Sequence, residues 1–120
     1  MSRDWRLYLG DMTLCCEKIA TFVGDLTRDE FLANVLVYDA VLRNLEILGE
    51  AAKHIPADVK VRLSDVAWRE IAGMRDWIAH GYFTIKADVV WNAIEVELPL
   101  LLRTLRAFKD EDQPGVGGTG

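Results

Sequence analysis

The apolar residues of this chain recur at helical spacing almost from end to end, and this period restricts its fold more than any other feature. The apolar positions of the first stretch are Leu7, Leu9, Met12, Leu14, Ile19, Ala20 and Val23. They predict one helix from about residue 4, and Gly24 follows where that helix would end. No stretch alternates convincingly with period two, as a half-buried strand would. The sequence therefore predicts an all-α fold.

Caps and helix breakers divide the next part of the chain. Thr27 and Glu30 have the spacing of a capping box, so a second helix is expected from there to about Lys53, before Pro56. Residues 54–63 are short and mixed, and they predict a connector with one or two helical turns.

A third long helix is expected after the connector. Ser64 and Asp65 offer its N-terminal cap, and Gly81 is a natural terminator. The apolar side of this helix would consist of Trp68, Ile71, Ala72 and Ile78.

The last helix is expected from about Ala87 to Phe108. Pro99 lies inside it and should bend it, because proline lacks the backbone N–H of a helical hydrogen bond. Residues 110–120 are expected to form a flexible acidic and glycine-rich tail, which leaves residues 1–109 as a single helical domain. Four long helices with short connections predict an antiparallel bundle with a short connector helix, and its modest core favours a dimer.

The charge balance argues against a broad basic surface. The chain has 14 Lys and Arg against 19 Asp and Glu, a net charge of −5, and three of the acids lie in the tail. Without them, 16 acids remain and the net charge is −2. Sequence-independent binding of nucleic acid depends on many neutralised phosphates, so any such contact is expected to be local.

The cysteines and the N-terminal residues indicate the compartment. Cys15 and Cys16 are adjacent, and in a helix their side chains diverge by about 100°, so no disulfide between them is expected. The first residues carry charges where a signal peptide is apolar, and no apolar run approaches the roughly 20 residues of a membrane span. A soluble cytoplasmic protein without membrane contact is the expectation.

A charged stripe runs along the second predicted helix. Asp39, Arg43, Glu46 and Glu50 follow one another at steps of four, three and four, which puts them on one face. The stripe is either a solvated outer face with Arg43 paired to its acidic neighbours, or the lining of a cleft.

A second polar cluster ends the third predicted helix. Arg75, Asp76, His80 and Tyr82 lie within eight residues. Arginine and histidine without a metal suit cleavage of RNA, whose 2′-hydroxyl is an internal nucleophile: imidazole moves the proton and guanidinium stabilises charge on phosphorus. The alternative is structural, with His80 at the negative end of the helix dipole and Arg75 paired with Glu46 or Glu50.

Metal and cofactor sites are not expected. His54 and His80 are 26 residues apart, and no pair of thiolates has ligand spacing. Arg43 among the three acids of the stripe disfavours a hard cation there. Trp68 and Trp91 are assigned to packing, because aromatic residues at helical spacing belong to cores far more often than to cofactor sites.

Five blocks of the sequence resemble the HepT-like toxins of the HEPN superfamily. They are residues 46–53, 68–76, 80–83, 90–91 and 98–101, found in order within residues 5 to 108. The signature of that family is R-x-x-x-x-H-x-Y with a polar residue after the arginine, and the chain matches it throughout at Arg75, Asp76, His80 and Tyr82.

The resemblance implies a homodimer whose metal-independent ribonuclease site takes both copies of the motif. Arg75 would stabilise the scissile phosphate, His80 would be the acid or base, and Asp76 would orient either of them. Glu46 and Glu50, together with Arg43 in the same stripe, would support Arg75 from the second helix.

The resemblance also implies a partner, a minimal nucleotidyltransferase that acts as antitoxin by transferring AMP to Tyr82. The added phosphate and bulk would obstruct the cleft for RNA. Tyr82 could instead merely pack beside Phe83. The rival function is a non-catalytic subunit that binds a nucleotide or docks the nucleotidyltransferase, which the lack of net positive charge favours slightly.

Overall fold

The computed structural model describes residues 3–80 and 86–112. Within them the chain forms helices and no strand, which confirms the predicted all-α class. The helices are α1 (Trp5–Val23), α2 (Arg28–Ala33), α3 (Val35–Ala52), α4 (Ala57–Arg62), α5 (Trp68–Ala79), α6 (Ala87–Asn92), the π-helical turn η1 (Ala93–Glu97) and α7 (Leu98–Asp112).

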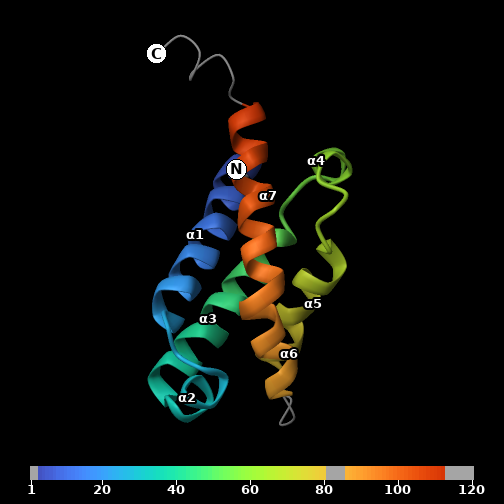
Figure 1. The fold of residues 1–120 in the computed structure, drawn as a ribbon. Helices are drawn as coiled ribbons and strands as arrows, with labels where there is room; N and C mark the ends of the chain where they lie inside the picture. Colours follow the sequence, from blue (N-terminus) through green and yellow to red (C-terminus); the bar gives the residue numbers. More distant parts are fainter. Residues whose placement is uncertain (1–2, 81–85, 113–120) are drawn as a thin grey trace.

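The long helices run up and down along one axis of the molecule (Figure 1). Helix α3 returns beside α1, α5 returns beside α3, and α6, η1 and α7 follow one another as a continuous helical run. The side chains that are almost completely buried come mainly from α1 and α3: Met12, Ile19, Phe31, Val41, Leu45, Leu48 and Val59. The apolar period of the sequence therefore corresponds to the core.

The predicted start of α1 near residue 4, its end at Gly24 and the capping box before α2 are confirmed. Asp4 caps α1 by accepting a hydrogen bond from the Arg6 amide, and Gly24 ends the helix with φ of 52°. In the capping box before α2, the Thr27 hydroxyl accepts from the Glu30 amide at 3.2 Å, and the Glu30 carboxylate accepts from the Thr27 amide at 2.9 Å.

The single second helix predicted from about residue 28 to Lys53 is wrong, because the chain breaks at Asn34. This residue has extended backbone angles, with φ −95° and ψ 95°, and it ends α2. Its side-chain oxygen accepts from the Val37 amide at 3.1 Å and so caps α3. The side chain of asparagine competes with helical hydrogen bonds for backbone groups in this way. The spacing of apolar residues alone does not reveal such a break.

The predicted cap at Ser64 and Asp65 is also wrong. Helix α5 begins at Trp68, and no side chain caps it through a hydrogen bond. The preceding turn buries Leu63 and Val66, and the Val66 amide donates to the Leu63 carbonyl at 3.1 Å. The Trp68 indole donates to the same carbonyl at 3.1 Å. Burial of the turn therefore displaces the start of the helix.

The final helical run begins at Ala87 as predicted and continues to Asp112, four residues beyond the expected end. A π-helical turn, η1, ends two residues before Pro99, the residue at which a bend is predicted. The side-chain amide of Asn92 donates to the Glu97 carboxylate at 3.0 Å across this turn. The two residues are five positions apart, a spacing that fits a π-helix. Residues 113–120 of the predicted tail lie outside the described residues.

Candidate active site between α3 and α5

Helices α3 and α5 approach each other most closely at Gly49. A Cβ atom at this position would lie 2.7 Å from the Arg75 Cβ and 2.7 Å from the Ile71 carbonyl oxygen. Both distances are shorter than real Cβ contacts, so only glycine fits without moving the helices. Gly49 therefore fixes how near Arg75 comes to α3.

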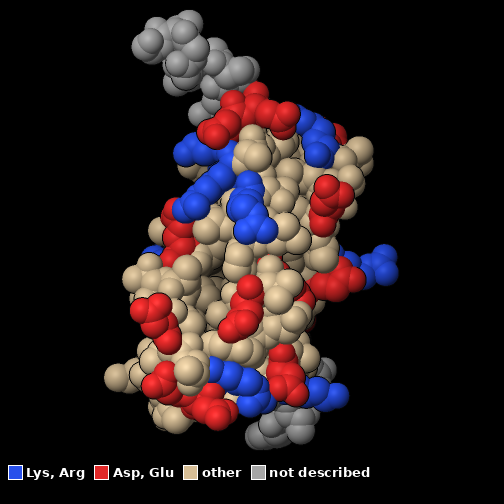
Figure 2. Space-filling model, viewed as in Figure 1, with Lys and Arg blue, Asp and Glu red and all other residues tan. Residues whose placement is uncertain are grey.

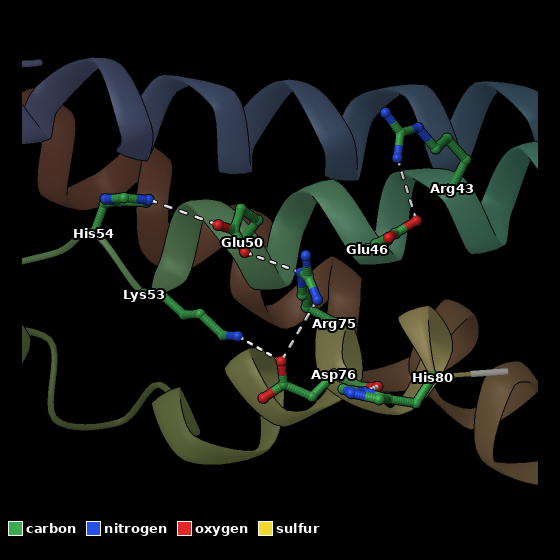
Figure 3. A network of polar contacts seen from close by, with 8 residues as sticks. All are labelled: Arg43, Glu46, Glu50, Lys53, His54, Arg75, Asp76 and His80. Carbon is green, nitrogen blue, oxygen red and sulfur yellow. Dashed lines mark hydrogen bonds and ion pairs between the residues drawn. The ribbon is translucent and has the colours of Figure 1, made fainter. Parts of the chain in front are cut away.

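Arg75 extends from α5 toward the acidic side of α3 (Figure 3). Its Nε lies 3.0 Å from the Glu50 Oε2, and one of its terminal nitrogens lies 3.7 Å from the Asp76 carboxylate. The Arg75 side chain is 34% exposed. Its guanidinium is thus held on one edge by Glu50 and remains accessible to a ligand.

Glu46 pairs with Arg43, not with Arg75. An Arg43 terminal nitrogen donates to the Glu46 Oε1 at 3.2 Å, three residues along α3. Both alternatives for the charged stripe are therefore partly met, since this pair is formed while Arg43, Glu46 and Glu50 also line a cavity of about 260 Å³. Arg75 lines the same cavity.

The Asp76 carboxylate is held by Lys53 at the end of α3. The Lys53 Nζ donates to the Asp76 Oδ1 at 2.6 Å. This hydrogen bond, with the positive charges of Lys53 and Arg75 nearby, lowers the pKa of Asp76 below its ordinary value and keeps it ionised at neutral pH. The sequence prediction that Asp76 orients His80 or Arg75 did not include Lys53.

His80 ends α5 and contacts Asp76 through the main chain. The His80 Nδ1 lies 2.6 Å from the Asp76 carbonyl oxygen. Since a carbonyl oxygen only accepts, Nδ1 carries the proton in this contact, and Nε2 is the basic nitrogen of the neutral ring. It is therefore the backbone of Asp76 that orients His80.

Arg75 and His80 have different neighbours within one chain. Figure 3 shows Arg75 directed toward α3, whereas His80 lies at the far end of α5 beside the Asp76 main chain. This agrees with the wide angle between positions 75 and 80 on a helix. Tyr82, with its neighbours Gly81 and Phe83, lies outside the described residues.

Three further residues lie at the site and were not singled out by sequence reasoning: His54, Tyr8 and Arg3. His54 lies with its Nε2 3.8 Å from the Glu50 Oε1, and its ring stacks on Tyr8 of α1 with centroids 4.4 Å apart and planes 10° apart. Arg3 contacts the Tyr8 ring at 4.5 Å from its centroid. Tyr8 comes from a helix far away in sequence, and nothing in the local sequence pattern identifies it.

Within residues 3–80 and 86–112, no group of three or more His, Cys, Asp or Glu side chains is placed to hold a metal ion. None of the helices in this described part of the chain has the length and apolar character that crossing a membrane demands.

Comparison with known proteins identifies the family. Residues 12–108 match the family described as ribonuclease HepT-like. The chain is 38% identical over 101 residues to the "Probable ribonuclease HepT" of Thermococcus cleftensis, an alignment that covers 84% of this chain and 92% of the relative. It is 32% identical over 108 residues to a "Putative RNase" of Caldanaerobacter subterraneus subsp. tengcongensis, covering 90% and 96% of the two chains. No solved structure matches significantly. On these matches, the chain belongs to the HepT-like ribonuclease family.

Proposed function

We propose that this protein is a metal-independent endoribonuclease that acts as the toxin of a two-component toxin–antitoxin module. The observation that carries the proposal is the pairing of an accessible Arg75, held by Glu50 beside a cavity, with a His80 whose Nδ1 is bonded to a carbonyl. The relatives named as ribonucleases support the same activity.

The chemistry follows from the hydrogen bond between the His80 Nδ1 and the Asp76 carbonyl, which leaves Nε2 as the nitrogen that accepts a proton. Its Nε2 takes the proton of an RNA 2′-hydroxyl, the 2′-oxygen forms a bond to phosphorus, and the bond from phosphorus to the 5′-oxygen breaks. The leaving oxygen takes a proton from water, and the His80 imidazolium returns its proton to the hydroxide that remains, so a 2′,3′-cyclic phosphate and a 5′-hydroxyl result. Arg75 donates hydrogen bonds to the phosphate oxygens as negative charge develops on them.

The proposed enzyme is a homodimer with a site built from both chains. Positions 75 and 80 lie about 140° apart around an ideal helix, so a second copy is the simplest source of a facing partner for each of them. An apolar groove of about 600 Å³ between α5 and the η1–α7 run offers a surface for that copy. Its lining includes Met74, Trp77, Val89 and Leu100, of which Val89 and Leu100 are about half exposed.

Control by a partner belongs to the same proposal. A minimal nucleotidyltransferase acting as antitoxin would join the Tyr82 phenol oxygen to the α-phosphorus of ATP, with release of pyrophosphate and the phenol proton. The support is the position of Tyr82, two residues after His80 in the family pattern. Incubation with the nucleotidyltransferase and ATP should add AMP mass to the wild type and none to Tyr82→Phe. Equal labelling of both would move the target elsewhere.

A non-catalytic nucleotide-binding or docking subunit is the second candidate, and the surface charge favours it. On the face shown in Figure 2, acidic and basic side chains are interspersed and no continuous basic field forms. The net charge of −5 agrees. A ribonuclease of this kind must therefore bind its RNA through a few local contacts.

Cleavage of RNA by the purified protein, with and without EDTA, separates the two candidates. The catalytic proposal expects equal cleavage in both conditions and 2′,3′-cyclic or 3′-phosphate ends. Arg75→Ala and His80→Ala should each lower the rate by about 100-fold or more while the protein stays folded. Arg69→Ala, an exposed arginine at the start of α5, is the matched control and should cleave normally. Normal cleavage by either site variant would overturn the assignment.

A further inference from the structure

The cavity beside Arg75 extends from this member of the catalytic pair to residues of α1 and α3 that have no part in the proposed cleavage chemistry. It has a volume of about 260 Å³ and lies among α1, α3 and α5, with Tyr8, Arg43, Glu46, Glu50 and Arg75 in its lining. A cavity of about 150 Å³ holds a benzene ring, so this one has room for a two-ring base and little more. Because Arg75 lines it, any occupant would lie next to the phosphate that Arg75 binds.

The lining selects the chemistry of the occupant. Carboxylates of Asp11, Glu46 and Glu50 only accept hydrogen bonds, whereas the guanidiniums of Arg3, Arg43 and Arg75 only donate them. These groups form ion pairs with one another, and an apolar ligand would cover the pairs without adding a hydrogen bond to either partner. An occupant that offers both donors and acceptors can bind both kinds of group.

Arg43 and Glu46 define which base fits. Their nitrogen and oxygen lie 3.2 Å apart, so a guanidinium and a carboxylate stand side by side at the cavity. Guanine presents two N–H donors on its N1 and N2 edge and two acceptors, O6 and N7, on the next edge. The Glu46 carboxylate matches the N1 and N2 donors, and the Arg43 guanidinium matches the O6 and N7 acceptors. Hydrogen bonding of arginine to O6 and N7 of guanine is the commonest specific contact between a side chain and a base. Adenine, cytosine and uracil do not offer such a pair of donors beside a pair of acceptors.

The two side chains keep enough capacity for this contact while they remain paired. A carboxylate has about four acceptor positions and a guanidinium has five N–H donors, and the pair uses one of each. The Glu46 side chain is 24% exposed and Arg43 is 68% exposed, so Glu46 forms the deeper wall and Arg43 can adjust. Tyr8, in contact with His54 and Arg3, limits the cavity on the side of α1.

We infer that this cavity is a base-binding subsite for guanine, formed by Glu46 and Arg43, on the nucleotide that adjoins the phosphate at Arg75. The inference rests on the proposed ribonuclease function and adds a sequence preference to it. RNA is read in this way mainly where it is single-stranded, because a splayed base exposes both edges.

Binding of free mononucleotides tests the subsite without any cleavage. Titration of the purified protein with GMP, AMP, CMP and UMP, followed by calorimetry and by NMR shifts of residues around the cavity, should show GMP binding most tightly. Glu46→Gln replaces one acceptor with a donor and should weaken the binding of GMP by about tenfold or more, while the binding of AMP changes little. Asp39→Asn, on the same helix but outside the cavity lining, should bind GMP as the wild type does.

Equal affinity for the four nucleotides would overturn the subsite. NMR shifts caused by GMP at residues away from the cavity would overturn it as well. Cleavage mapping then separates this result from a failure of the proposed function. If the protein cuts RNA, guanine should occur at one fixed position relative to the cut, and inosine there, which lacks the 2-amino donor, should raise KM more than it lowers kcat. Cutting without base preference would refute the subsite and leave the ribonuclease standing. Selective binding of GMP without RNA cleavage would refute the ribonuclease function and leave the guanine subsite standing.

Discussion

The contact between α1 and α3 and the contact between α3 and α5 are built in different ways. The first buries large apolar side chains, such as Met12 and Ile19 of α1 with Leu45 and Leu48 of α3. The second depends on the bare backbone at Gly49 and is bordered by ion pairs of Glu50 and Lys53 with α5. Apolar packing secures the fold in one region. Close backbone approach in the other leaves polar groups accessible for chemistry.

The largest expected loss of stability comes from the apolar contact. Leu48→Ala removes a side chain with no exposed surface and should lower the free energy of unfolding by about 2–5 kcal/mol. Leu36→Ala on the same helix removes a leucine that is 84% exposed and should change it by less than about 0.5 kcal/mol. Urea denaturation measures both. Similar losses in the two variants would contradict the assignment of the core.

A smaller loss of stability, accompanied by a loss of activity, is expected at the α3–α5 contact. Gly49→Ala places a methyl group 2.7 Å from both the Arg75 Cβ and the Ile71 carbonyl, so the helices must separate, at a cost of about 1–3 kcal/mol. The displaced Arg75 should also lower RNA cleavage. Gly10→Ala, with nothing within 4 Å of its Cβ, should stabilise α1 by about 0.5–1 kcal/mol and leave cleavage unchanged. If Gly49→Ala lowered neither the free energy of unfolding nor the rate of RNA cleavage, the claim that the close approach at Gly49 positions Arg75 would be wrong.

The smallest effect is expected from the exposed ion pair of Lys53 and Asp76. Because the folded state lowers the pKa of Asp76, the pair contributes stability above the ordinary pKa of aspartate, and the contribution is lost as pH falls through the lowered pKa. Lys53→Met should raise the pKa of Asp76 toward its ordinary value in an NMR titration. Lys18→Met, on an exposed part of α1, should leave it where it is. An unchanged pKa of Asp76 in Lys53→Met would show that another group lowers the pKa of this carboxylate.

Sequence reasoning succeeded where the structure depends on apolar periodicity and local caps. The all-α class, the ends of α1 and the capping box at Thr27 followed from patterns within a few residues. The break at Asn34 was missed because one polar residue ended a period that continued on both sides. The start of α5 was misjudged because burial of the preceding turn overrode the cap at Ser64.

The candidate site was predictable only in part. Residue types and helical spacing selected Arg75, Asp76 and His80, and the pairing of Arg75 with Glu50 was among the expected contacts. The partners Lys53 and Tyr8 come from other helices, and their approach depends on helix packing that no local pattern encodes. Gly49 carried a signal, since a glycine inside a helical period often marks a close contact.

Mixing two inactive variants tests the central claim that Arg75 and His80 act together across a dimer. Each variant, Arg75→Ala or His80→Ala, should be inactive alone. In mixed dimers, the Arg75 of one chain meets the His80 of the other, so one complete site forms. Unfolding and refolding the two together at equal concentration should restore RNA cleavage to about a quarter of the wild-type rate, since about half of the dimers are mixed and each has one site of two. A mixture that stays as inactive as its components would contradict the account.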